Sequence, residues 1–154
     1  MTYHLAQVNV ARLLEPLDSE RLQGFVAALD PVNASADGAA GFVWRLQSEE
    51  GNATSITAFE WDVGQSAGII VNLSVWVSPE ALTAWVHGPE HRAVLLQRRT
   101  WFERMSDATT ALWWVRAGQL PSTLDAELRV RHLRARGPTP FAFTFKETFD
   151  RPHD

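Results

Sequence analysis

The segment AGIIVNLSVWV, residues 67 to 77, constrains the fold of this chain more than any other stretch. Its side chains alternate with a period of two, which is typical of a β-strand. One face would carry only apolar residues and the other a mixture: Ile69, Val71, Leu73, Val75 and Val77 against Ile70, Asn72, Ser74 and Trp76. A strand with apolar residues on both faces belongs inside a sheet that is covered on both sides.

The rest of the chain supplies the other elements of an α+β domain. Apolar and β-prone segments predict three further strands, at residues 3–10, 42–47 and 110–117. Helical spacing of apolar residues, with capping residues at Asp18 and Ser78, predicts helices over about 18–30, 79–86 and 89–105. The order β-α-β-β-α-β predicts a ferredoxin-like sheet with its helices on one face.

A C-terminal extension follows these elements. A last helix over about residues 122–136 is expected to dock through Leu124, Leu128 and Leu133, and the aromatic segment FAFTF comes after it. A chain of 154 residues has the length of one domain. We therefore predict a single domain over 1–154, with a core of about 1–117 and an extension of about 118–150.

The sheet face opposite the two core helices needs a cover of its own. The segments 69–77 and 110–117 are apolar on both faces, and a lone sheet with helices on one side would expose half of these residues. A second copy of the same sheet is the expected cover, which predicts a homodimer that forms a dimeric α/β barrel.

Composition excludes several classes of function. The chain has 18 acidic and 14 basic residues, so its charge gives no reason to expect nucleic acid or an anionic membrane as partner. It has no cysteine, which removes disulfides, cysteine-based zinc sites and thiol catalysis. No signal-like leader or apolar run of roughly 18 residues is present. We expect a cytoplasmic protein.

Two histidines four residues apart, His87 and His91, raise the question of a metal site. On one continuous helix they would lie on the same face, one turn apart. Gly88 and Pro89 stand between them, and proline removes a backbone donor and clashes with the preceding turn. We therefore place them on separate helical segments and expect no bound metal.

The helix expected after Pro89 contains polar residues in its apolar stripe. That stripe, about 120° wide, holds Val94, Leu95, Trp101, Phe102 and Met105. His91 and Arg98 fall near its middle, whereas Arg92, Arg99 and Glu103 point towards solvent. An unpaired buried polar group costs on the order of 1 to 3 kcal/mol. His91 and Arg98 are therefore either paired with protein groups or exposed to a pocket between helix and sheet.

Polar and aromatic residues elsewhere could complete such a pocket. The polar candidates on strands are Gln7, Asn9, Arg45, Asn72 and Ser74. Aromatic rings that could stack on a flat ligand, or simply fill the core, include Trp44, Trp76, Trp85 and Trp101. The chain has no glycine-rich phosphate loop, no G-x-S-x-G elbow and no H-E-x-x-H motif.

Five motifs spread over most of the chain resemble one known family, catalogued as domain of unknown function 3291. They are GFVWRL at 41–46, NLSVW at 72–76, H-R-A-V-x-x-x-R-R-x-W-F at 91–102, LWWV at 112–115 and HLRARGPTPFAFTF at 132–145. The resemblance implies the dimeric α/β-barrel group, which includes cofactor-independent monooxygenases and haem-degrading enzymes. The resemblance to the haem-degrading relatives implies an Asn on the first strand and a Trp in the helix after the third, and Asn9 and Trp85 are similar in placement. The monooxygenases use Asn, Trp and Arg, and Asn9, Trp85 and Arg98 would serve similarly, without an exact motif to align. Ten residues beyond Trp85, where a haem-degrading relative has histidine, this chain has Leu95, and His91 lies one turn earlier.

These observations lead to one expected function and two alternatives. The chain is expected to bind a small aromatic or apolar molecule, and to act as a monooxygenase without a cofactor. In that case Asn9 and Arg98 would polarise a substrate carbonyl or stabilise its enolate, His91 would act as base, and the tryptophans and Asn72 would line the site. The alternatives are a non-catalytic dimeric ligand-binding or interaction module, and a haem-binding or haem-degrading protein.

Overall fold

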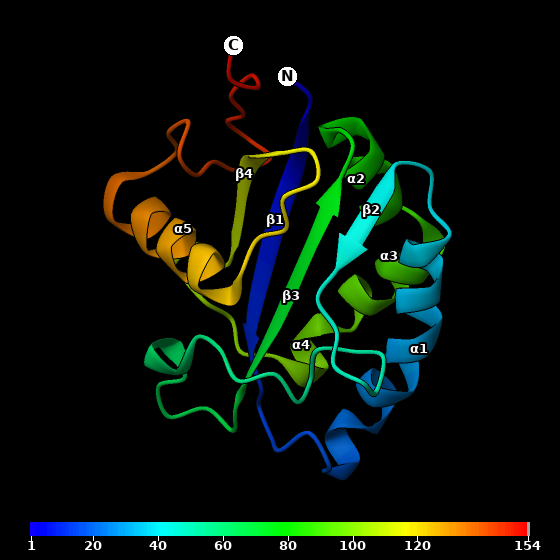
Figure 1. Cartoon of the computed structure of the whole chain (residues 1–154). Coiled ribbons are helices and arrows are strands. Elements are labelled where there is room, and N and C mark those ends of the chain that lie inside the picture. The colour runs from blue at the N-terminus through cyan, green and yellow to red at the C-terminus, as the bar shows by residue number, and fades with distance from the viewer. Residues whose placement is uncertain (154) are drawn as a thin grey trace.

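A four-stranded antiparallel sheet forms the centre of the computed structural model, which describes residues 1–153 (Figure 1). Its strands are β1 (Tyr3–Arg12), β2 (Phe42–Arg45), β3 (Ile69–Trp76) and β4 (Thr110–Arg116). They lie in the order β2-β3-β1-β4, so the first and third strands of the chain pair in the middle. With the chain order β-α-β-β-α-β, this arrangement is ferredoxin-like, and the predicted α+β fold is confirmed.

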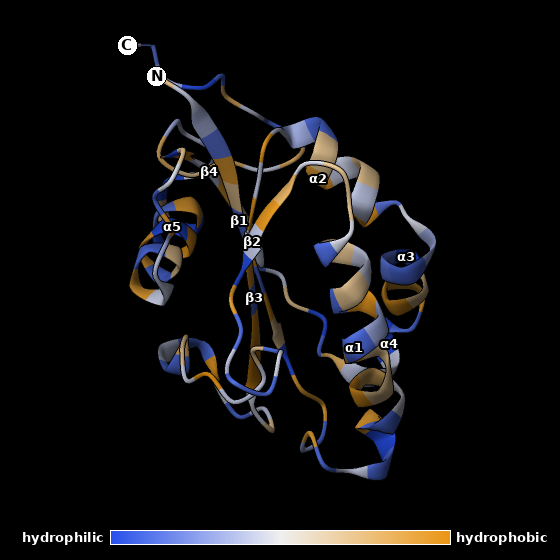
Figure 2. Cartoon of the chain, turned by 45° about the vertical axis from the view of Figure 1, so that its right-hand side comes forward, coloured by the Kyte–Doolittle hydropathy of each residue, from blue (hydrophilic) through white to orange (hydrophobic). Residues whose placement is uncertain are grey.

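Helices cover both faces of this sheet. They are α1 (Gln23–Asp37), α2 (Pro79–Val86), α3 (Pro89–Leu96), α4 (Arg98–Trp101) and α5 (Thr123–Arg136). Short 3-10 turns occupy Glu20–Leu22 and Glu60–Asp62. Figure 2 shows the sheet between α5 on one side and α1, α3 and α4 on the other. Among residues 1–153, none of these helices combines the length and apolar character that a membrane span needs.

The first helix is longer than the sequence predicts. It was expected to end at Asp30-Pro31, but α1 contains Pro31 and continues to Asp37. Proline breaks a helix because it deprives the carbonyl four residues earlier of a partner. Here that carbonyl belongs to Ala27, and both Ala27 and Pro31 are exposed, so water can replace the lost hydrogen bond.

The expected single helix over residues 89–105 is also wrong. The chain leaves helical geometry at Gln97, where φ is −103° and ψ is 5°, and α4 then adds only one turn. Phe102 is already extended. A helical wheel assumes one axis, so it misplaces every residue after the break. The separation of His87 and His91 at Gly88-Pro89 is confirmed, since α2 ends before His87 and α3 begins at Pro89.

The sheet face expected to be open is covered by the chain's own C-terminal helix. Residues Ala126, Val130 and Leu133 of α5 pack in one buried cluster with strand residues that include Val75 and Trp113. Trp113 is 1% exposed without any second chain. The expectation that a second copy of the sheet covers this face is therefore wrong, because α5 covers it, and the homodimer loses the argument that led to it.

The residues through which α5 docks also differ from expectation. Leu124 and Leu128 are 62% and 49% exposed, and only Leu133 of the three expected leucines is buried. The buried residues Ala126, Val130 and Leu133 recur at spacings of four and three, which places them on one side of the helix. Ala126 and Val130, which are smaller than the exposed leucines, thus face the sheet together with Leu133.

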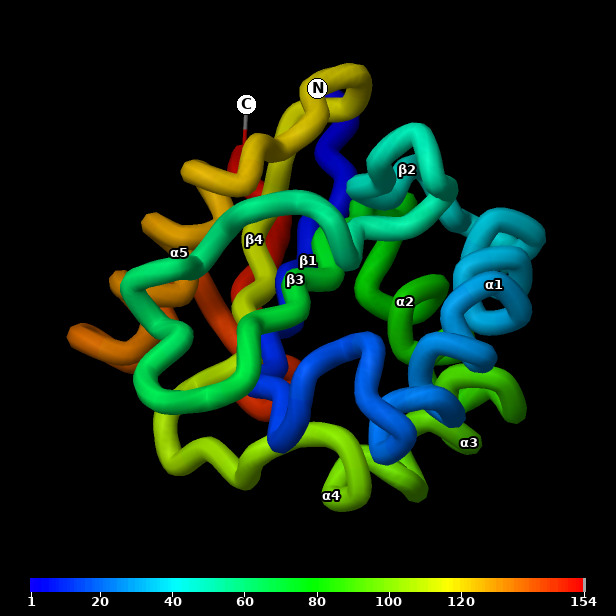
Figure 3. The backbone as a smooth tube through the Cα atoms, turned by 90° about the horizontal axis from the view of Figure 1, so that it is seen from below, coloured from blue at the N-terminus to red at the C-terminus, as the bar shows by residue number. Residues whose placement is uncertain are grey.

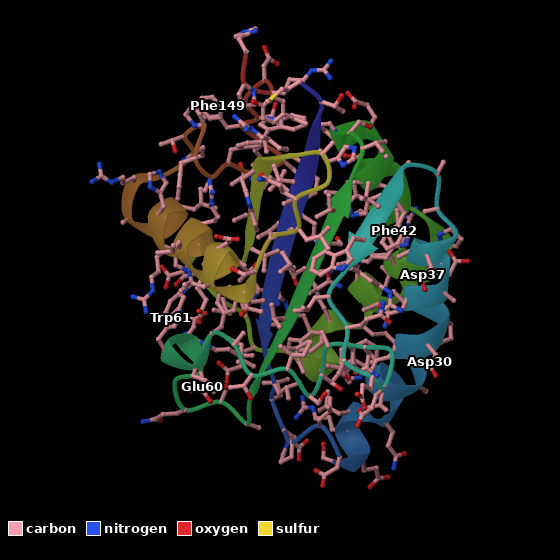
Figure 4. All side chains as sticks on the ribbon, in the orientation of Figure 1. Asp30, Asp37, Phe42, Glu60, Trp61 and Phe149 are labelled. Atoms are coloured by element: carbon pink, nitrogen blue, oxygen red, sulfur yellow. The ribbon has the colours of Figure 1, made fainter. Side chains whose placement is uncertain are left out.

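A buried ion cluster fixes the long β2–β3 connection against the α5 face. Asp62, 5% exposed, accepts hydrogen bonds from Arg134 of α5 at 2.7 Å and from Arg12 of β1 at 2.8 Å. Beside it, Glu127 accepts bonds from the backbone of Phe59 and from the indole of Trp61. Figure 4 shows Trp61 next to α5. These contacts hold Phe59 in the core cluster.

Candidate functional site

A cavity of about 400 Å³ lies between the sheet and the layer of helices α1 to α4. In Figure 3 this helical layer lies on the opposite side of the strands from α5. The cavity has a floor of strand residues and a wall of mostly apolar helix residues, including Phe25, Leu29, Val32, Val94 and Phe102. Its volume is within the range of small-molecule sites, roughly 300 to 1,000 Å³.

The floor is a row of hydrogen-bonded polar side chains across three strands. Asn9 of β1 and Asn72 of β3 are direct cross-strand partners. The amide of Gln7 donates to Oδ1 of Asn72 and to Oγ of Ser74, both at 2.7 Å. Asn9 donates through Nδ2 to the hydroxyl of Thr110 on β4, at 2.8 Å. These bonds fix the two asparagine amides in position.

Part of each amide remains available to a ligand. Within residues 1–153, Nδ2 of Asn72 and Oδ1 of Asn9 make no hydrogen bond. Both asparagines line the cavity and are exposed, although they stand in the two central strands of the sheet. The site therefore offers one donor and one acceptor next to each other, a pair suited to the oxygen atoms of a carbonyl and a hydroxyl group.

An aromatic stack forms one wall. Trp85 of α2 stacks on Trp76, with ring centroids 5.4 Å apart. Trp85 also contacts the ring of His91 on α3, with centroids 4.5 Å apart. The Trp85 indole donates to the hydroxyl of Ser35 on α1 at 3.0 Å. Contacts with Ser35 on α1 and His91 on α3 thus fix the orientation of Trp85, which lines the cavity.

His91 is held in a defined protonation state. Its Nδ1 lies 3.2 Å from the carbonyl oxygen of Val86, which can only accept, so Nδ1 carries the proton and Nε2 keeps a free lone pair. Burial lowers the pKa of His91 below its usual 6.5. The hydrogen bond to Val86 raises the pKa and the nearby His87 lowers it, and the net shift is downwards. The neutral imidazole is therefore the form present at neutral pH.

Arginines stand at the edge of the cavity. Arg98 and Arg99 both line it and are exposed, and Arg98 donates to the carbonyl of Leu95 at 2.6 Å. Arg45 lines it from β2, but its guanidinium is paired with Asp37 of α1 at 2.8 Å. The expected burial of Arg98 in an apolar stripe is wrong, because the helix breaks at Gln97. For the same reason Arg99 and Glu103, expected to point away, line the cavity too.

Most of the predicted site residues come together in this cavity. His91, Arg98, Asn9, Asn72 and Trp85 all line it. The other three tryptophans do not. Trp76 is fully buried behind Trp85, Trp101 is buried against Phe25, and Trp44 packs on the α5 face of the sheet.

Sequence reasoning missed several cavity residues. Thr110 was read only as the start of a strand, yet its register opposite Asn9 gives it a place on the floor. Asn52, Ala53 and Thr54 of the β2–β3 connection also line the cavity, and a loop has no period from which this could be predicted. For a metal ion, residues 1–153 contain no group of three His, Cys, Asp or Glu side chains that could hold one.

The sequence from residue 4 to residue 154 matches a family described as Domain of unknown function (DUF3291). The match covers nearly the whole chain. The protein belongs to the DUF3291 family. The resemblance inferred from the five sequence motifs is therefore confirmed. No curated protein matches the sequence of this DUF3291 chain.

Several solved structures are similar to the DUF3291 chain at low sequence identity. NE2512 from Nitrosomonas europaea, a protein of unknown function, is 14% identical with a TM-score of 0.45, over 79% of this chain and 97% of that one. Rv0793 from Mycobacterium tuberculosis is 17% identical with a TM-score of 0.44, over 77% and 99%. SnoaB from Streptomyces nogalater, a cofactor-independent oxygenase, is 16% identical with a TM-score of 0.44, over 77% and 98%.

Proposed function

We propose that this DUF3291 protein binds a small, largely apolar molecule with a carbonyl or hydroxyl group in the cavity between sheet and helices. The observation that carries the proposal is the pair Asn9 and Asn72. Central strands normally present apolar residues to the helices that cover them. Here the two asparagines instead open into a cavity with a free donor and a free acceptor.

The energetics of the site support a ligand with both apolar and polar parts. Apolar side chains such as Phe25, Phe102 and Trp85 line the wall, and contact with an apolar body would remove them from water. The free amide groups would be left unsatisfied by a purely apolar ligand, at a cost of about 1–3 kcal/mol each. A ring with one or two oxygen substituents meets both demands.

The chemistry that fits best is oxygenation of an electron-rich phenol without a cofactor. Nε2 of His91 would take the phenolic proton, and the amide of Asn72 would donate to the resulting phenolate oxygen. The phenolate can then reduce dioxygen. One oxygen atom ends as a new ring carbonyl, the other leaves as water, and a phenol with a free para position becomes a quinone.

Oxygen uptake with hydroxyquinol-type phenols tests this proposal. We expect uptake and quinone absorbance with the unmodified protein, a loss of roughly tenfold or more in His91→Ala, and no change in His87→Ala. His87 is the matched control because it is exposed and does not line the cavity. Binding of the phenols without oxygen uptake would instead favour the non-catalytic binding module.

Haem serves as a second arm of the same experiment. A haem spectrum that shifts on mixing with the protein, and that does not shift with His91→Ala, would favour the haem alternative. If the phenols do not bind and the haem spectrum does not shift, the proposed function is contradicted.

The homodimer and the cytoplasmic location remain predictions of the sequence. Face-to-face pairing of two sheets would require α5 to leave its own sheet, because its residues Ala126, Val130 and Leu133 occupy that face. Light scattering of the intact chain decides between one and two copies, and a dimer would have to use a surface other than this one or exchange α5.

A further inference from the structure

The lining of the cavity has more basic than acidic side chains, whereas the protein as a whole has more acidic ones. The chain carries 18 acidic and 14 basic residues. The residues that line the cavity include Arg45, Arg98 and Arg99 but only one carboxylate, Glu103. A cleft with one sign of charge concentrates ligands of the opposite sign.

Two of these arginines lack a carboxylate partner. Arg45 is neutralised by Asp37, whereas Arg98 and Arg99 form no ion pair within the part of the chain that the structure describes. Arg98 uses one N–H on the carbonyl of Leu95, which leaves the rest of its guanidinium free. Glu103 forms no ion pair with either of them. Arg98 and Arg99 both line the cavity and are both exposed, so we call their part of the cavity its mouth. Unpaired guanidinium groups at this mouth are suited to a carboxylate or a similar oxyanion.

The floor and the mouth of the cavity therefore favour different chemical groups of one ligand. The floor offers the neutral amides of Asn9 and Asn72, and His91, which also lines the cavity, is neutral because of its burial. Neither attracts a full negative charge as strongly as an arginine does. A charged group would bind at the mouth, with the apolar body pointing inwards.

We propose that the ligand is an amphipathic organic anion, with an aromatic or other apolar body in the cavity and an anionic group held by Arg98 and Arg99 at its mouth. This inference rests on the proposed function, since it names the class of molecule that the same cavity binds. It assigns Arg98 and Arg99 to ligand specificity and not to the reacting centre.

Two fluorescent probes of similar shape provide the test. 1-Anilinonaphthalene-8-sulfonate carries a negative charge, and N-phenyl-1-naphthylamine is neutral. We expect the sulfonate to bind the unmodified protein more tightly. The double variant Arg98→Gln/Arg99→Gln should weaken its binding by roughly tenfold and change binding of the neutral probe by less than about twofold.

Arg92→Gln is the matched control, because Arg92 is exposed on α3 and does not line the cavity. It should leave both affinities unchanged. Ala28→Trp, which fills the cavity from α1, should weaken both probes if they bind there. Circular dichroism of each variant verifies that it is folded.

The outcomes separate the two proposals. If both probes bind in the cavity with equal affinity, or if the double variant weakens both alike, the anion specificity is refuted and the proposed function stands. If neither probe binds, or if Ala28→Trp leaves sulfonate binding intact, both the specificity and the binding site are refuted.

Discussion

His91 packs against the ring of Trp85, and its burial favours the neutral imidazole. An unfolded chain would take up a proton at His91 as the pH falls below 6.5, whereas the folded chain resists protonation until a lower pH. Stability should therefore be full above 6.5 and decrease as the pH falls from 6.5 through the lowered folded pKa. We expect His91→Gln to reduce the decrease in Tm between about pH 7.5 and about pH 5.5. His153→Gln, at an exposed position outside the cavity, should leave the decrease intact. Equal pH profiles for all three proteins would contradict this.

Outside the cavity, the buried Asp62 forms ion pairs with two arginines, Arg12 and Arg134. Burial by itself would raise its pKa, but hydrogen bonds and charge from Arg134 and Arg12 outweigh burial and hold the pKa below 3.8. Its stabilisation is thus present above 3.8 and is lost as the pH falls through the folded pKa.

Replacement of Asp62 tests that interpretation at neutral pH. Asp62→Asn leaves two arginines without their carboxylate and should lower the free energy of unfolding by about 3 kcal/mol. Asp37→Asn removes an ion pair whose carboxylate is 49% exposed, and it should cost less than about 1 kcal/mol. Denaturant unfolding measures both, and similar losses in the two variants would show that burial of the Asp62 cluster does not matter.

At the scale of the elements, Gly41, directly before β2, lies close to Ala81 of α2. Gly41 has φ of 81°, and a Cβ there would lie 2.5 Å from Cβ of Ala81 and 2.7 Å from a methyl carbon of Val77. Gly118 has φ of 91° but no neighbour within 4 Å. We expect Gly118→Ala to cost about 1 kcal/mol from backbone strain alone, and Gly41→Ala to cost about 1–3 kcal/mol more from the clash. Equal losses of Tm would mean that the contact relaxes freely.

The strands could be predicted from the sequence because side chains in a strand alternate between its two faces with a period of two. The assignment of Asn72 to one face and Val71 to the other is confirmed by burial. Helix lengths could not be predicted as well, because neither the solvent-facing Pro31 nor the break at Gln97 has a local signal that fixes its effect. The site follows the same division. Asn9 and Asn72 were predicted as polar residues within strands, whereas Arg99 was misplaced because its helix is broken.

At the scale of the whole molecule, α5 takes the place that the sequence had given to a second chain. A side-chain period cannot tell a cover in the same chain from a cover in another, since both bury the same face. If the cover is α5 itself, Val130→Asp should destabilise the folded chain by about 3 kcal/mol or more. The loss of Tm should be the same over about a hundredfold range of protein concentration. A loss that shrinks as the concentration rises would indicate that the face is buried between two chains.

The central claim is that the cavity between sheet and helices binds a ligand, and side-chain N–H signals report on it directly. In a ¹H–¹⁵N spectrum titrated with 1-anilinonaphthalene-8-sulfonate, we expect the amide signals of Asn9 and Asn72 and the indole signal of Trp85 to shift. The indole signals of Trp61 and Trp113, which do not line the cavity, should stay in place. Shifts confined to Trp61 or Trp113, with Asn72 and Trp85 unchanged, would contradict the claim.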